Sequence, residues 1–246
     1  MIRPALLLTL LIATPLAAQT MGRCAPPPDG TPQAFVALTT PQGRITLALE
    51  TKRAPLTAAN FLRYVDQKRY DGASFYRAMK IGPEAVGLIQ GGFRQDGRRM
   101  LAPIAHEPTS KTGLTHCDGA ISMARAAPGS ARSEFFIIVE GIPSLDAAPQ
   151  AMGDNAGFAV FGRVVDGMDV VRRIQAAKTD PSAGEGAMRG QMIAAPVAIL
   201  SARRVKPPAP PAPPAAPPPA APAAPAPPPA DHAPPPPAPA PAPVPN

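Results

Sequence analysis

The chain has 246 residues, of which 38 are proline, and its formal net charge is +7. Its lysine and arginine residues are scattered and are not interleaved with aromatic residues, so the composition argues against a nucleic-acid partner. After two ends of unusual composition are set aside, about 170 residues remain, which is enough to bury a full hydrophobic core.

The first 18 residues are typical of a secretory signal peptide. Arg3 supplies the positive charge, and the run ALLLTLLIA that follows is too short to span a bilayer. The small residues Ala17 and Ala18 suit cleavage before Gln19. The alternative is an ordinary N-terminal helix. We expect an exported, periplasmic protein, and no later run is long enough for a transmembrane helix.

The C-terminal segment, residues 207–246, consists almost entirely of proline and alanine. It has no apolar periodicity and cannot form a core, so we expect a semi-rigid polyproline II tail outside the folded domain. Such a tail could serve as a passive spacer. Alternatively, it could be a ligand for a partner in the cell envelope.

Two cysteines, Cys24 and Cys117, are present in the chain. An oxidising compartment would permit a disulfide between them. Two cysteines so far apart carry little pattern information, and two unrelated thiols are an equally good interpretation. His116 beside Cys117 suggests a metal ligand, but no second, suitably spaced pair of ligands accompanies it. We therefore expect no metal site.

The central residues predict a mainly β domain over 34–206, preceded by a polar lead-in over 19–33. Strands strung together without a helix between each pair argue against a parallel sheet and favour an antiparallel barrel or sandwich closed by helices. A long polar loop is expected over 94–118. Strands are expected at 34–40, 43–50, 74–79, 85–93, 120–126, 134–140, 157–165 and, broken, at 192–205, with helices at 56–68 and 168–178.

One strand contains an unexpected charge. Period-two alternation places Phe75, Arg77 and Met79 on one face. Arg77 could reach from a strand end into water. It could instead be held at the edge of an apolar pocket to polarise a substrate. The next strand carries a single polar side chain, Gln90, before a glycine pair that suggests a bulge or a close backbone approach.

Five stretches, taken together, carry the most specific signal in the chain. They are NFLRYVDQKRYDGASFYR, LIQGGF, AISMARA, SEFFI and GFAVFGRVVDGMDVV. In this order they resemble the cyclophilin family of peptidyl-prolyl cis-trans isomerases over nearly all of residues 35–205, and the last resembles the exported bacterial branch most closely. The resemblance implies a closed eight-stranded antiparallel barrel capped by two α-helices.

The resemblance also implies roles for individual residues. The family's catalytic arginine falls on Arg77 and its amide-binding glutamine on Gln90. Two departures affect the pocket: Gly87 replaces a common phenylalanine and should open one wall, and Ser144 replaces an aromatic residue. The implied substrate-binding residues are Phe136, Leu88, Ala124, Leu145, Phe158 and Glu134, the last in place of a common glutamine.

The expected function is acceleration of X–Pro isomerisation in unfolded or partly folded exported polypeptides. Rotation about this bond makes and breaks no covalent bond, so neither a cofactor nor a metal is required. We expect a monomer with no integral membrane segment after signal cleavage. The alternative function is that of a non-catalytic proline-binding or holdase module tethered to the envelope by its tail.

Overall fold

A computed structural model describes residues 22–28, 31, 33–82, 86–94, 96–152 and 155–208. The expected signal peptide and the tail beyond Pro208 lie outside the described residues. The chain separates into two units after Pro208, and every described element belongs to the first unit. No helix among these residues is long and apolar enough to cross a membrane.

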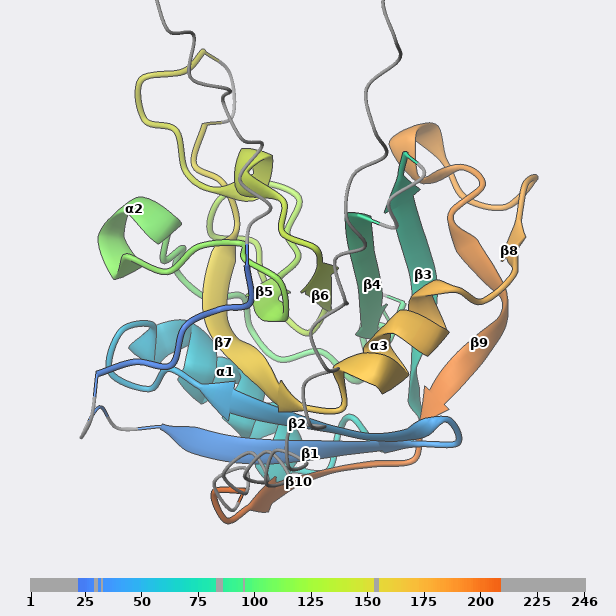
Figure 1. Ribbon diagram of the computed structural model, residues 1–246, viewed down its shortest axis with the longest axis horizontal. Helices are drawn as coiled ribbons and strands as arrows, with labels where there is room; N and C mark the ends of the chain where they lie inside the picture. Colours follow the sequence, from blue (N-terminus) through green and yellow to red (C-terminus); the bar gives the residue numbers. More distant parts are fainter. Residues whose placement is uncertain are drawn as a thin grey trace, which may run out of the picture. The chain divides into compact units, whose positions relative to one another are not determined.

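The described strands form one antiparallel sheet, whose order is β10-β1-β2-β7-β5-β6-β4-β3-β9-β8 (Figure 1). Each strand expected from the sequence is present, with ends that differ by up to three residues. The strands are β1 (Ala34–Thr40), β2 (Gly43–Leu49), β3 (Ala73–Ile81), β4 (Val86–Gly92), β5 (Ala120–Met123), β6 (Phe135–Val139), β7 (Ala159–Asp166), β8 (Thr179–Asp180), β9 (Met192–Ile199) and β10 (Ser201–Val205).

The last two strands close the sheet into a barrel. Only Leu200 separates β9 from β10, yet β9 pairs with β3 and β10 pairs with β1. The Leu200 amide donates a hydrogen bond to the Thr39 carbonyl oxygen over 2.8 Å. The chain therefore stays hydrogen-bonded to β1 where it passes from its pairing with β3 to its pairing with β1. Counted as one broken strand, β9 and β10 complete an eight-stranded barrel, and the short β8 is an addition that the sequence did not predict.

Two helices at the expected positions cover the barrel, α1 (Pro55–Asp66) and α3 (Met168–Gln175). Helix α1 packs against β7 and β10, whereas α3 packs against β2, β3, β4 and β6. Figure 1 accordingly shows α1 behind the strands and α3 in front of them. A four-residue helix, α2 (Thr109–Thr112), and two 3-10 turns, η1 (Pro143–Leu145) and η2 (Gly186–Met188), are too short to show periodicity in the sequence.

The inward face of α1 is held by a cluster of aromatic side chains. Phe61 is fully buried, and its ring centroid lies 4.9 Å from that of Tyr70, 5.4 Å from that of Phe135 and 5.2 Å from that of Phe161. Its ring meets that of Phe135 edge to face, a favourable geometry for aromatic pairs. Because each fully buried ring contributes roughly 1.5–3 kcal/mol, this cluster fixes the helix on the barrel.

The polar loop 94–118 serves to cap helix α1. Ala54, the N-cap residue of α1, has no side chain that could accept a hydrogen bond from the first turn of the helix. The carboxylate of Glu107, only 2% exposed, accepts instead from the backbone amides of Leu56 and Thr57 over 3.2 and 2.7 Å. A carboxylate at this end also opposes the positive end of the helix dipole.

A disulfide joins Cys24 to Cys117, so of the two interpretations left open by the sequence the bonded one is confirmed. The Cys24 backbone amide also donates to the Asp118 carbonyl oxygen over 3.0 Å. In addition, the backbones of Arg23 and Asp118 form an isolated parallel β-bridge. The lead-in is therefore attached to the barrel just before β5, across a sequence separation of 93 residues.

Replacing both Cys24 and Cys117 with serine should lower the free energy of unfolding by about 2–4 kcal/mol, because a cross-link over a long loop restricts the unfolded chain. For a domain of this size the melting temperature should then fall by about 4–16 °C. Thermal melts measure the change. Intact-mass spectrometry without reductant should show the wild-type chain two hydrogens lighter than the reduced chain, and two free thiols on exported protein would contradict the bond.

Candidate active site

A β-bulge in β3 aims Arg77 out of the core. Phe75 pairs with Gly91 of β4, but the next residue of β4, Gln90, pairs with Arg77, so Tyr76 is an extra residue in β3. Such an insertion reverses the alternation of side chains beyond it. Phe75 and Ala78 are accordingly buried in the core while Arg77 is half-buried. The prediction that Phe75 and Arg77 share a face is therefore wrong.

The two residues of the bulge hold the side-chain amide of Gln90 from both ends. Arg77 donates from Nη1 to Gln90 Oε1 over 2.7 Å. The opposite end of the amide, Nε2, donates to the hydroxyl oxygen of Tyr76, also over 2.7 Å. The bulge thus brings together the expected catalytic pair, Arg77 and Gln90, and fixes which end of the amide faces the guanidinium.

Glu134 is hydrogen-bonded to Tyr76, on the side of Tyr76 away from Gln90 in this series of hydrogen bonds. The Tyr76 hydroxyl donates to Glu134 Oε2 over 2.5 Å, and Glu134 Oε1 accepts from the Phe93 amide over 2.8 Å. Burial, reinforced by the charge of Glu134, holds the pKa of Tyr76 well above its ordinary value, so the hydroxyl keeps its proton. Glu134 is only 8% exposed. It is as buried as Gln90 and is linked to that residue through Tyr76.

A second glutamine fixes the other side of the arginine. Arg77 donates from Nε to Gln191 Oε1 over 2.9 Å, and Gln191 in turn donates from Nε2 to the Ala187 carbonyl oxygen over 2.7 Å. Burial lowers the pKa of Arg77 from its ordinary value, but a guanidinium stays charged in proteins. The sequence offered no local signal for Gln191, which lies 114 residues away.

The apolar half of the site continues across the neighbouring strands. Gln90 of β4 pairs with Phe136 of β6, and Phe136 pairs with Ser122 of β5. Phe136 is 4% exposed, and its ring lies 5.4 Å from that of Phe158 in an edge-to-face contact. The Phe158 amide donates to the Leu145 carbonyl oxygen over 3.0 Å, which brings Leu145 to the same region.

The two remaining expected pocket residues lie at the margins of this group. Leu88 stands two residues before Gln90 on the same face of β4, opposite Met79, and is 5% exposed. Ala124 follows β5 directly, is half-buried, and donates its amide to the Glu134 carbonyl oxygen over 2.8 Å. Arginine, glutamine and apolar side chains thus occupy one continuous region of β3, β4, β6 and β5.

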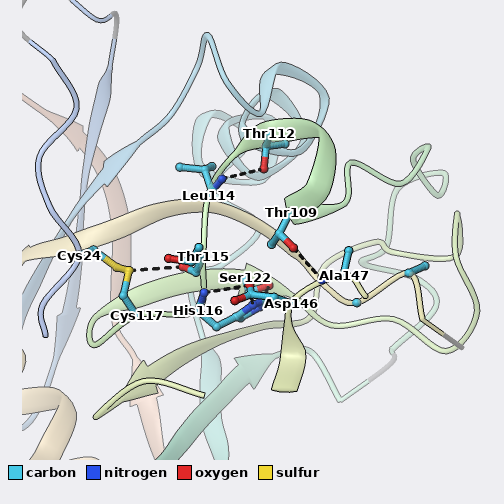
Figure 2. A network of polar contacts seen from close by, with 12 residues as sticks. Cys24, Thr109, Thr112, Leu114, Thr115, His116, Cys117, Ser122, Asp146 and Ala147 are labelled. Carbon is cyan, nitrogen blue, oxygen red and sulfur yellow. Dashed lines mark hydrogen bonds and ion pairs between the residues drawn. A yellow bond between two sulfur atoms is a disulfide. The ribbon is translucent and has the colours of Figure 1, made fainter. Parts of the chain in front are cut away.

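Figure 2 shows a polar network that contains His116, Ser122 and Asp146. His116 is fully buried, with Nδ1 2.7 Å from Asp146 Oδ1 and Nε2 3.0 Å from Ser122 Oγ. Its ring stacks on that of Phe136, with 5.9 Å between the ring centroids. The order of these groups resembles a hydrolytic triad, but Ser122 is 0% exposed, so no substrate can reach its hydroxyl. The network is a support for the pocket.

No metal centre is found: within the described residues, no three His, Cys, Asp or Glu side chains gather to hold an ion. A cavity of about 160 Å³ opens beside the disulfide and is lined by Glu50, Arg53 and Arg163 among others. It shares no residue with the group around Arg77 and Gln90, so it is separate from the candidate active site.

Gly87 does not open a wall of the pocket, contrary to expectation. A Cβ on Gly87 would lie 1.9 Å from the Met79 carbonyl oxygen and 2.8 Å from Gln175 Nε2 of α3. Strand alternation explains this position, because Leu88 and Gln90 occupy the face of the site and Gly87 occupies the other. Ser144 lies exposed in η1, beside Leu145.

Residues 35–203 match the family model described as cyclophilin type peptidyl-prolyl cis-trans isomerase/CLD. Peptidyl-prolyl cis-trans isomerase cyp18 of Streptomyces antibioticus is 39% identical over 172 residues, which cover 68% of this chain and 96% of that protein. Peptidyl-prolyl cis-trans isomerase B of Escherichia coli is 34% identical over 152 residues, which cover 60% of this chain and 88% of that protein.

The fold is similar to that of a cyclophilin type peptidyl-prolyl cis-trans isomerase from Cryptosporidium parvum, with a TM-score of 0.56 at 20% identity. That alignment covers 72% of this chain and 100% of the solved chain. A second structure of that protein, determined in the presence of the dipeptide Ala-Pro, gives a TM-score of 0.55. This chain therefore belongs to the family of cyclophilin-type peptidyl-prolyl cis-trans isomerases.

Proposed function

We propose that this protein accelerates X–Pro isomerisation in exported polypeptides, with Arg77 and Gln90 as its catalytic residues. The observation that carries the proposal is the bonded Arg77–Gln90 pair beside a buried apolar group that contains Phe136, in a chain of this family. Peptidyl-prolyl isomerase activity is the activity of the named relatives. The catalytic residues and the exported substrates are our inference.

The reaction requires a site that prefers a twisted amide to either planar form. The barrier to rotation is about 20 kcal/mol because rotation breaks amide resonance, and it falls when the twisted state is bound more tightly. In that state the prolyl nitrogen regains a lone pair that can accept a hydrogen bond. Contacts with the described residues use three of the five guanidinium N–H groups of Arg77, so the others can donate to this nitrogen or to the proline carbonyl.

Gln90 can bind the other side of the rotating amide. Its side-chain NH₂ group has two hydrogens, and Tyr76 accepts one of them. The second can be donated to the carbonyl oxygen of the residue that precedes proline. Phe136, Leu88 and Phe158 would hold the proline ring in an apolar environment, with Ala124 and Leu145 along the groove, so that rotation is confined to the N-terminal side of the bond.

We further propose that the chain belongs to the exported bacterial branch and acts as a monomer in the periplasm. The N-terminal sequence pattern supports export, and the Cys24–Cys117 bond is typical of an oxidising compartment. The proposed organisation is a signal peptide (1–18), a lead-in (19–33), the isomerase domain (34–206) and a Pro/Ala-rich tail (207–246). Its partners would be proline-containing, unfolded or partly folded chains.

Turnover of a short proline peptide tests the proposal against the alternative of a holdase. We expect the exported protein, with and without residues 207–246, to accelerate isomerisation equally, because the tail has no apolar periodicity with which to pack on the barrel. Melting temperatures should also agree. A chain that prevents aggregation of an unfolded client but never accelerates isomerisation would be a holdase, and a loss of several degrees on deletion would show that the tail packs on the domain.

A further inference from the structure

We propose that Glu134 and Tyr76 are positioning residues that set the orientation of the Gln90 amide and, through it, the placement of Arg77. The inference rests on the proposed function of Arg77 and Gln90 and extends it to two side chains that need not touch the substrate. It begins from one chain of hydrogen bonds that runs from Glu134 through Tyr76 and Gln90 to Arg77.

The direction of every bond in this chain follows from its first member. An ionised carboxylate only accepts hydrogen bonds, so the Tyr76 hydroxyl must donate its single hydrogen to Glu134. The hydroxyl oxygen is then an acceptor toward Gln90, and the amide must turn its NH₂ group to Tyr76. The amide oxygen consequently faces the Arg77 guanidinium. With the opposite orientation, two donors would face each other and the bond to Arg77 would be lost.

The surroundings of Glu134 are built to hold a carboxylate. Its second oxygen accepts from the Phe93 amide over 2.8 Å, and Ser133 Oγ lies 3.3 Å away. A Cβ on Gly92 would lie 2.5 Å from both carboxylate oxygens, so only glycine leaves them room. The sequence predicted a bulge or a close backbone approach at the glycine pair after Gln90, and the second of these glycines, Gly92, is required by the close approach of Glu134.

In this chain, a neutral amide of the same shape at position 134 could not keep both of these contacts as they are. Glutamine has one oxygen, but Glu134 accepts from Tyr76 and from Phe93 on different oxygens. If the glutamine NH₂ faced Phe93, two donors would meet. If it faced Tyr76, the hydroxyl would accept there and could donate to Gln90, which would reverse the amide. Glu134 and Tyr76 thus orient the Gln90 amide through the charge of Glu134. Replacing Glu134 with glutamine removes this charge but leaves the buried volume of the side chain the same.

The test compares Glu134→Gln, Tyr76→Phe and the double variant, with Tyr64→Phe as control. Tyr64 is also a buried tyrosine, but its hydroxyl accepts from the Leu101 amide over 2.7 Å, away from this chain of bonds. In metal sites, loss of an outer partner that orients a ligand typically costs about 10- to 100-fold, and we use the same scale for the partners of Gln90. We expect a loss of that size in kcat for both single variants, KM within about twofold, and no further loss in the double variant, because both residues act on Gln90.

The outcomes separate this inference from the proposed function. A wild-type protein without isomerase activity would overturn the proposed function itself. An active wild type whose Glu134→Gln and Tyr76→Phe variants keep kcat within about twofold would overturn the positioning role alone. Equal losses in the Tyr64→Phe control, or single-variant losses that multiply in the double variant, would also count against it, because they would indicate general destabilisation or independent effects.

Discussion

Replacing Arg77 with alanine is expected to lower kcat and kcat/KM together by about 100- to 1000-fold. The guanidinium is held in place by Gln90 and Gln191 before any substrate arrives. Its strongest contact would form only when the prolyl nitrogen gains a lone pair, that is, in the transition state. An interaction of this kind contributes to the rate and not to ground-state binding, so KM should change little.

The fold should survive this change because Arg77 is half-buried at the edge of the site and not in the core. Circular dichroism and a thermal melt verify folding, and a protease-free peptide assay measures the rate. Arg77→Lys should restore little of the activity, since the compact ammonium of lysine cannot donate to both Gln90 and Gln191 as the planar guanidinium does. Arg98→Ala removes an equal charge from an exposed side chain and serves as control. A folded Arg77→Ala protein within a few-fold of wild type would contradict the mechanism.

Replacing Phe136 with alanine should reduce both stability and substrate binding. The side chain is 4% exposed, and its ring centroid lies 5.9 Å from that of His116 and 5.4 Å from that of Phe158. Removing a buried phenylalanine typically costs about 3–5 kcal/mol. In a domain of this size the melting temperature should fall by about 6–20 °C. Because the proline ring would lose its apolar contact, KM should rise as well.

A comparison with Phe161 separates these two effects. Phe161 is fully buried against Phe61 in the core and does not belong to the site group. Phe161→Leu should lower the melting temperature, while the folded protein keeps the wild-type KM. Thermal melts and steady-state kinetics below the transition measure both quantities. Phe136→Ala with an unchanged KM would show that this ring does not contact the proline.

The sequence alone predicted the order of the elements and the family. Short strand-like apolar runs bounded by turn residues located the strands from β1 to β7. Helical spacing located α1 and α3 within three residues of their ends. The motifs around Arg77 and Gln90 identified the pair that the barrel brings within 2.7 Å. These features depend on neighbours in the chain, and a sequence records such neighbours directly.

The tertiary structure decided how those residues act. A bulge adds one residue to one strand but leaves the local sequence pattern unchanged, so alternation placed Arg77 on the face of Phe75 when the pairing with β4 turns it away. Gln191 and Glu134 approach Arg77 and Tyr76 from distant segments, and no local pattern records such contacts. The pairing of Cys24 with Cys117 was likewise open until the barrel brought them together. Strand register and long-range hydrogen bonds are properties of the closed sheet, which is why only the folded chain determines them.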